Sequence, residues 1–235
     1  MPTFEDFSST LANFSGTARL FPLPNLVMFP HVLQPLHVFE PRYRDLMEES
    51  LSGDRLLAIA TLRPGWEDDY EGRPPLYPTA CLGRIASHCR LKQGSYNVLL
   101  LGVQRVRLVE ELAPAKRFRE ARVELCTDVY PSVKAHELSL LQERLRSALV
   151  KILPRLPAAE EQIDQLLASD VPLGVLSDIV SYLLDINLRA KQRLLSEANV
   201  HRRTQTLLKH LAAAVQNAPT QDSNALVFPP EFSPN

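Results

Sequence analysis

The pattern of apolar and polar residues changes near residue 130. Before that point, short apolar runs alternate with turns rich in proline and glycine, which indicates strands. The run at 56–62 is continuously apolar and predicts a strand buried on both faces. Further strands are expected at 81–91, 96–101, 103–112 and 121–126, with a hairpin turn at Gly94 and Ser95. Successive short strands favour a compact barrel.

The segment 20–53 combines apolar residues with proline and one well-marked helix start. Proline cannot donate a hydrogen bond to a sheet, so four prolines are expected to separate short extended pieces: Pro22, Pro24, Pro30 and Pro35. Pro41 suits the first turn of a helix, and apolar residues at helical spacing continue as far as Gly53. This glycine is placed to end the helix.

After Pro131 the spacing of apolar residues becomes helical. Helices are expected at 138–152, 160–168, from Asp170 through Leu184, at 189–198 and at 200–215. The first residues carry Phe4, Phe7, Leu11 and Phe14 at near-helical spacing, which suggests a short docking helix. The resulting division is a leader (1–18), a barrel lobe (19–130), a helical bundle (131–216) and a polar, proline-containing tail (217–235) expected to be disordered.

Composition indicates an ordinary globular protein and argues against several partners. Lysine plus arginine against aspartate plus glutamate is 15 to 16 up to Tyr130 and 11 to 11 after it, so neither half attracts nucleic acid or membrane by bulk charge. Glu5 and Asp6 stand where a secretory signal would need positive charge, which predicts a cytoplasmic protein. Three cysteines without a C-x-x-C pair argue against a disulfide framework and a zinc site: Cys81, Cys89 and Cys126.

Several ordered motifs resemble the amino-terminal substrate-binding domain of Lon proteases. They are LFPLP at 20–24, Phe-Pro at 29–30, Pro-Leu at 35–36, FEPRY at 39–43, Gly-Arg-Ile at 83–85, YNVLL at 96–100 and the run 102–107. The residues that carry the resemblance are Phe21, Pro22, Pro24, Phe39, Glu40, Arg42, Tyr43, Gly83, Gly102 and Arg105. It covers 19–130 well and the helical part more loosely. One departure is His31, where that family more often has glycine.

The resemblance implies an α+β fold, with a PUA-like pseudo-β-barrel followed by an α-helical bundle. It implies a non-catalytic module that recognises unfolded or degron-bearing polypeptides in protein quality control, with a separate ATP-dependent protease as a further partner. Binding could use strand addition at a barrel edge or an apolar groove between the lobes. A homodimer is left open.

Catalytic motifs are absent from the sequence. None of the eight glycines is followed by lysine, so there is no Walker phosphate-binding loop, and the chain has no room for ATPase and Ser-Lys peptidase domains after the bundle. The nearest approach to a zinc-protease motif, at His136 and Glu137, has Leu140 in place of the second histidine. We therefore expect a stand-alone module without enzymatic activity or cofactor.

Candidate substrate contacts come from two segments. The proline-rich segment offers Phe29, Pro30, His31 and Leu33, and the loop 63–79 offers Trp66, Tyr70 and Tyr77. For the loop we favour the alternative that these rings hold it onto the barrel. For Glu40 we favour an ion pair with a barrel arginine over a place in a polar rim.

Two other functions remain open. RNA binding through the barrel would use Arg105, Arg107, Lys116, Arg117 and Arg119 on phosphates, although the balanced charge argues against it. A small-molecule hydrolase would need an unconventional site, for which we find no motif. The short basic cluster 201–203 is expected to be a solvated helix face.

Overall fold

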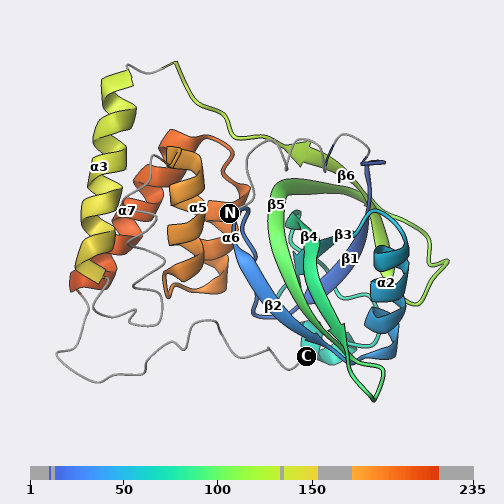
Figure 1. Ribbon diagram of the computed structural model, residues 1–235. Coiled ribbons are helices and arrows are strands. Elements are labelled where there is room, and N and C mark those ends of the chain that lie inside the picture. Colours follow the sequence, from blue (N-terminus) through green and yellow to red (C-terminus); the bar gives the residue numbers. More distant parts are fainter. Residues whose placement is uncertain (1–10, 12–13, 133–134, 153–170, 217–235) are drawn as a thin grey trace. The chain divides into compact units, whose positions relative to one another are not determined.

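The computed structural model describes residues 11, 14–132, 135–152 and 171–216, and the chain forms two compact units that divide between Cys126 and Thr127 (Figure 1). Among the described residues, the first unit is a β-barrel that carries helix α2 (Pro41–Ser52) and a short 3₁₀ helix, and the second unit is helical. This is the predicted α+β class. Among the described residues, no helix is both long and apolar enough to cross a membrane. The expected leader contacts of Phe4 and Phe7, the helix at 160–168 and the tail lie outside these residues.

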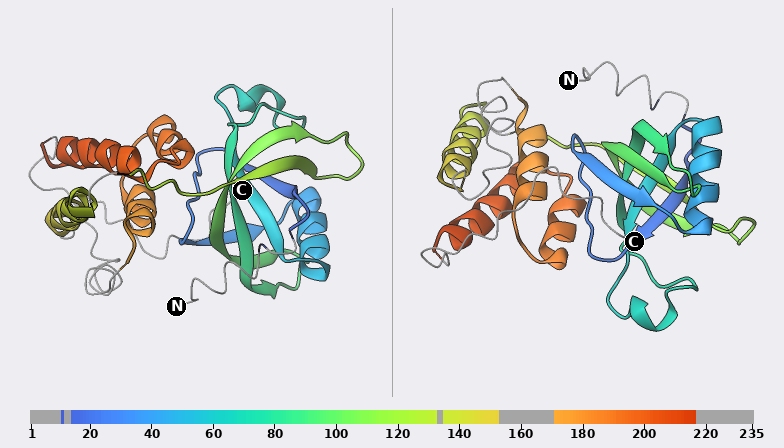
Figure 2. Two further views of the ribbon diagram at one scale, coloured as in Figure 1. Left: turned by 90° about the horizontal axis from the view of Figure 1, so that it is seen from above. Right: turned by 60° about the horizontal axis from the view of Figure 1, so that its bottom comes forward.

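Six strands form the barrel unit. They are β1 (Thr17–Leu23), β2 (Leu33–Val38), β3 (Leu56–Thr61), β4 (Thr79–Arg90), β5 (Tyr96–Glu111) and β6 (Arg119–Cys126). The sheet order is β2-β5-β4-β3-β1-β6, and β6 at the end of this order also pairs with β5. Five strands therefore close into a ring, and β2 is added along the first half of β5 (Figure 2). All pairs are antiparallel except β1 with β3.

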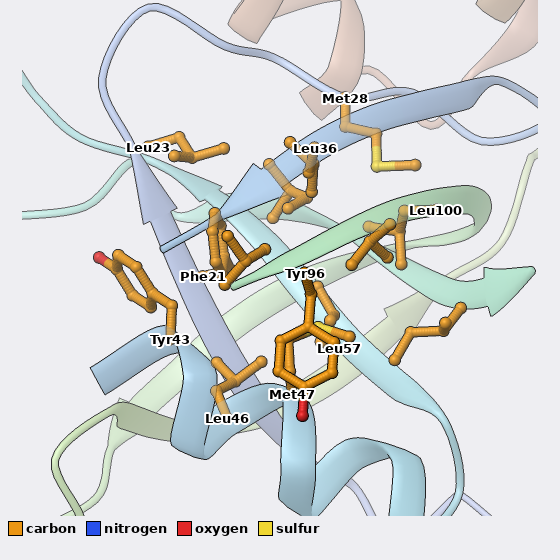
Figure 3. Packing of buried hydrophobic residues seen from close by; sticks show 14 of the residues in the cluster. Phe21, Leu23, Met28, Leu36, Tyr43, Leu46, Met47, Leu57, Tyr96 and Leu100 are labelled. Carbon is orange, nitrogen blue, oxygen red and sulfur yellow. The ribbon is translucent and has the colours of Figure 1, made fainter. Parts of the chain in front are cut away.

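Helix α2 (Pro41–Ser52) covers one of the two apolar clusters of the barrel. It begins at Pro41 after an extended Glu40 and ends at Gly53, as predicted. Leu46 and Met47 point from α2 into a cluster that includes Phe21 (Figure 3). Strand β3 contributes to both clusters and is buried on both faces, which confirms the interpretation of the run at 56–62.

Strand β5 is one strand of 16 residues rather than the two that were predicted. Gly102 lies within this strand and does not end it. Because glycine has no side chain, the segment before β2 can approach Gly102 closely. His31 N–H donates to Gly102 O (2.8 Å), and Gly102 N–H donates to Val32 O (2.8 Å). His31 has a φ of 65°. His31 and Val32 thus lie opposite the single residue Gly102, and His31 is in the left-handed region. This is the arrangement of a glycine-type β-bulge.

His31 occupies the position in this bulge that glycine normally takes, where a β-branched residue is strongly disfavoured. We expect His31→Gly to keep the free energy of unfolding within about 1 kcal/mol of the parent, since relief of backbone strain offsets the added freedom of the unfolded chain. His31→Val should lower it by about 2 kcal/mol. Urea unfolding of both variants tests this, and equal stabilities would contradict it.

The helical unit contains α3 (Ala135–Ile152), α5 (Leu173–Leu183), α6 (Leu188–Ser196) and α7 (Val200–Gln216). Apolar side chains of α3, α5 and α7 are buried, among them Leu145, Leu176 and Leu207. Residues directly after β6 belong to this unit: Val129 N–H donates to Ala198 O (2.9 Å). The division therefore falls four residues before the predicted one.

The expectation of a solvated basic face at 201–203 is wrong for Arg203. Its side chain is fully buried and pairs with Asp128 (2.7 Å) and Asp178 (3.3 Å). Arg202 is exposed, as expected. The ion pairs of Arg203 thus link α7 to α5 and to the segment after β6 inside the helical unit.

Candidate functional site

A cleft of about 540 Å³ lies in the barrel unit beside the start of α2. Three stretches far apart in sequence line it: the entry to α2, the loop 71–73 and the segment 114–119, with Pro22 from β1. We call it the α2 cleft. Its lining residues are Pro22, Glu40, Pro41, Arg42, Tyr43, Glu71, Gly72, Arg73, Pro114, Lys116, Arg117, Phe118 and Arg119.

Arg42 organises one wall of this cleft. Its guanidinium lies 4.8 Å from the ring centres of both Tyr43 and Tyr70. Arg42 Nε donates to Glu40 Oε2 (2.9 Å), and the Tyr70 hydroxyl donates to Glu40 Oε1 (2.7 Å). Burial raises the pKa of the Tyr70 phenol, and its bond to the Glu40 carboxylate raises it further, so Tyr70 stays protonated as the donor.

Glu40 therefore pairs with Arg42 in the first turn of its own helix, and the prediction of a barrel arginine as its partner is wrong. The two side chains leave the backbone at the helix entry, two residues apart, whereas the barrel arginine at 105 is turned into the interior with 3% exposure. The prediction that aromatic rings hold the loop 63–79 on the barrel is confirmed for Trp66 and Tyr70. The two rings pack edge to face against each other, and both pack against a core cluster of the barrel. This loop contains a short 3₁₀ helix, η1 (Trp66–Asp69).

The remaining charged residues that line the α2 cleft are mainly basic. The side chains of Arg73 and Lys116 are 36% exposed and that of Arg117 is 72% exposed. Arg119 is instead buried, where it pairs with Glu111 and donates to Pro74 O (2.9 Å). The lining as a whole carries five basic side chains and two acidic ones.

Of the four predicted contacts in the proline-rich segment, two are buried and two are at least partly accessible. Phe29 and Pro30 are buried, so the expectation that they offer exposed apolar surface is corrected. They are covered because the bulge at Gly102 draws their backbone against β5. His31 is half-buried, and Leu33 is 44% exposed. In the loop, Tyr77 is half-buried beside Arg63 and lines no wall of the α2 cleft.

The phosphate contacts expected for RNA binding are also divided. Arg105 and Arg119 are buried, at 3% and 8% exposure, and this contradicts their assignment as surface cations. Arg107 is exposed and paired with Glu124 on the neighbouring strand. Lys116 and Arg117 remain accessible.

A second surface feature lies on the outer side of β2. Side chains alternate along a strand, so Leu33, Pro35, His37 and the following Phe39 share one side of β2. On that side Pro35 is buried, His37 is half-buried, and Leu33 and Phe39 are exposed. Phe39 is 43% exposed and stacks on His37 at 5.9 Å. We call Leu33, His37 and Phe39 the β2 stripe. Phe39 was identified only through the family motif, although its alternation with buried Leu36 and Val38 marks it as an outward residue.

The free edge of β2 is shaped by Pro35. Among the described strands, β2 pairs with β5 alone. Because Gly102 N–H donates to Val32 O, the even-numbered residues of β2 are the ones that hydrogen-bond to β5. The backbone nitrogen of Pro35, an odd-numbered residue, therefore faces the free edge of β2. A proline there has no N–H to donate to a further strand, so it disfavours strand pairing at this edge.

No metal site is evident in the described part of the chain, because no three of its His, Cys, Asp or Glu side chains gather closely enough to hold an ion. The α2 cleft presents apolar side chains, guanidinium groups, an ammonium group and two carboxylates, and the β2 stripe presents two apolar side chains and an imidazole.

Comparison with known proteins identifies relatives of this chain. The family model of the ATP-dependent protease La (LON) substrate-binding domain matches residues 17–213. Lon protease 2 of Myxococcus xanthus is 27% identical over 194 residues, which are 82% of this chain and 23% of that protein. Lon protease of Anaeromyxobacter dehalogenans is 25% identical over 82% of this chain and 22% of that protein. The chain thus spans less than a quarter of these two relatives.

Solved structures show the same fold. The Lon N-terminal domain protein from Xanthomonas campestris has a TM-score of 0.61 at 22% identity, and covers 82% of this chain and 97% of that one. The N-terminal domain of the Mycobacterium avium complex Lon protease has a TM-score of 0.64 at 18% identity, over 83% and 98% of the two chains. The α+β fold is therefore shared along both units.

Proposed function

Because the chain belongs to the Lon substrate-binding domain family, we propose that it is a non-catalytic module that binds unfolded or degron-bearing polypeptides through the β2 stripe. The observation that carries this proposal is the exposure of Leu33 and Phe39, at 44% and 43%, on one side of an otherwise buried strand. Exposed apolar side chains grouped on one surface are typical of sites that bind other chains.

The β2 stripe offers side-chain recognition rather than strand addition. Covering the exposed part of Leu33 or Phe39 would contribute about 1 kcal/mol each, which suits weak binding of many unfolded sequences. Pro35 removes one N–H from the middle of the free edge, so an added strand would lose a bond there. We therefore place the contacts on the face of β2 and not along its edge.

The proposal extends to partners. The relatives are Lon proteases, and the matched region is their substrate-binding domain. We infer that the chain works in cytoplasmic quality control, with an ATP-dependent protease as a further partner. RNA binding is the weaker alternative, because two of its five expected cations, Arg105 and Arg119, are buried.

The test is binding of a labelled, disordered peptide of about 20 residues with spaced leucine and phenylalanine, measured by fluorescence anisotropy with the full chain. The double variant Leu33→Ser/Phe39→Ser should bind about tenfold more weakly, which corresponds to about 1.4 kcal/mol. Val109→Ser is the matched control, because Val109 is 51% exposed on β5 and lies outside the stripe.

A single-stranded RNA of similar length is titrated in parallel over a range of salt concentrations. Peptide binding that survives added salt and weakens only in the double variant supports the proposal. Unchanged peptide affinity in the double variant would remove the β2 stripe from the site. Salt-sensitive binding of RNA without peptide binding would replace the proposed function.

A further inference from the structure

We propose that the α2 cleft binds carboxylate groups of acidic polypeptide segments. This inference rests on the proposed function and deepens it, because it names the class of polypeptide that the barrel unit prefers. It depends on the charge, exposure and shape of the cleft, which are independent of the β2 stripe.

The charge that faces the cleft is positive although the unit as a whole is balanced. Five basic side chains line it against Glu40 and Glu71. Glu40 is already engaged by Arg42 and by the Tyr70 hydroxyl. The carboxylates that pair with the other four basic side chains lie outside the lining: Asp45, Glu49, Glu111 and Glu120. An incoming carboxylate would therefore meet mainly cations.

Three of these cations are accessible enough to bind a ligand. Arg117 is the most exposed, and its nearest carboxylate, on Asp45, is 3.6 Å away, which is beyond a hydrogen bond. Lys116 reaches Glu49 and Glu120 yet keeps 36% of its side chain exposed. Arg73 donates to Leu112 O through both terminal nitrogens (3.2 and 3.3 Å) and lies 3.7 Å from Glu111, yet keeps 36% of its side chain exposed. One exposed ion pair contributes little by itself, but three together would give about a tenfold preference.

The apolar lining of the cleft favours a polypeptide over a nucleic acid. It consists of prolines and rings: Pro22, Pro41, Pro114, Tyr43 and Phe118. Stacking of bases needs an open ring face. Here Phe118 is 5% exposed and lies under Lys116 at 5.3 Å, and Tyr43 is 2% exposed and lies under Arg42. The rings therefore contribute apolar contact without a stacking platform.

The experiment compares three disordered peptides with the same apolar residues, flanked by glutamate, glutamine or lysine, on the full chain. The parent protein should bind the glutamate peptide about tenfold tighter than the glutamine peptide. Lys116→Gln/Arg117→Gln should reduce this ratio to about twofold or less. Arg107→Gln/Arg122→Gln removes the same charge from exposed positions of β5 and β6 outside the cleft, and should leave the ratio unchanged.

A short oligoglutamate without apolar residues separates this inference from the proposed function. Its binding, measured by calorimetry, should be lost in Lys116→Gln/Arg117→Gln and kept in the control pair, even if the apolar peptides fail to bind. Equal binding of the glutamate and glutamine peptides, with no oligoglutamate binding, would overturn the inference alone. An equal loss in both double variants would assign the effect to overall charge and overturn it, and so would displacement of oligoglutamate by single-stranded RNA at lower concentration.

Discussion

Replacing Arg203 with methionine is expected to lower the stability of the helical unit by about 3–5 kcal/mol. Arg203 is completely buried and its guanidinium donates to both carboxylate oxygens of Asp128, at 2.9 and 2.7 Å. It also donates to Glu197 O (2.8 Å) and to Ser177 Oγ (3.0 Å), and it lies 3.3 Å from the buried Asp178. Methionine fills similar volume but leaves two carboxylates without their cation.

Arg202→Met is the matched control, because the neighbouring Arg202 is exposed on the same turn of α7 and should change stability by less than about 0.5 kcal/mol. Hydrogen exchange of α5 and α7 under mild urea measures the helical unit separately from the barrel. Protection of β3 and β4 should be kept in both variants. Equal behaviour of the two variants would show that the ion pairs of Arg203 contribute little to the stability of this unit.

The burial of Arg203 could have been predicted from its helical spacing, although the neighbouring basic residues suggested an exposed position. Read as a cluster with His201 and Arg202, it looks like a solvated basic face. Its position, however, falls on the same side of α7 as Val200, Leu207 and Leu211, all of which are buried. What the sequence could not supply is the partner, since Asp128 is 75 residues away and its approach depends on tertiary packing.

The elements of the barrel were largely predictable, because burial of one or both faces leaves a direct mark on the sequence. The continuous run of β3 and the start of α2 at Pro41 are examples. The α2 cleft was not predictable, although the entry to α2 and the cations at 116–119 had been noted separately. They meet because the β1–β6 register pairs Leu20 with Arg119, which brings the segment 114–119 beside the entry to α2. No local pattern encodes such a register.

The proline-rich segment shows why apolar residues beside prolines need not be exposed. Phe29 and Pro30 had the appearance of a surface signature, yet both are buried. Their burial depends on a partner more than seventy residues along the chain, because Gly102 is what allows their backbone to pack against β5. The contribution of this close approach can be measured directly.

Gly102→Ala is expected to destabilise the barrel unit by about 3 kcal/mol. A Cβ at this position would overlap the carbonyl oxygen of Phe29 and lie 3.0 Å from its carbonyl carbon and 3.1 Å from Pro30 Cα. These are backbone atoms held by the bulge at His31, so they cannot move aside as the end of a flexible side chain would. Urea unfolding followed by the fluorescence of Trp66, the only tryptophan of the chain, reports on this unit.

Gly16→Ala is the control that separates close approach from backbone strain. Gly16 has a φ of 81°, but a Cβ there would meet only Val123 O at 3.9 Å. Alanine should therefore cost only the strain of a left-handed residue, about 1 kcal/mol. If Gly102→Ala is no more destabilising than Gly16→Ala, the segment before β2 can shift away from β5 at little cost. Phe29 and Pro30 would then be able to leave the core, and their place among the polypeptide contacts would have to be reconsidered.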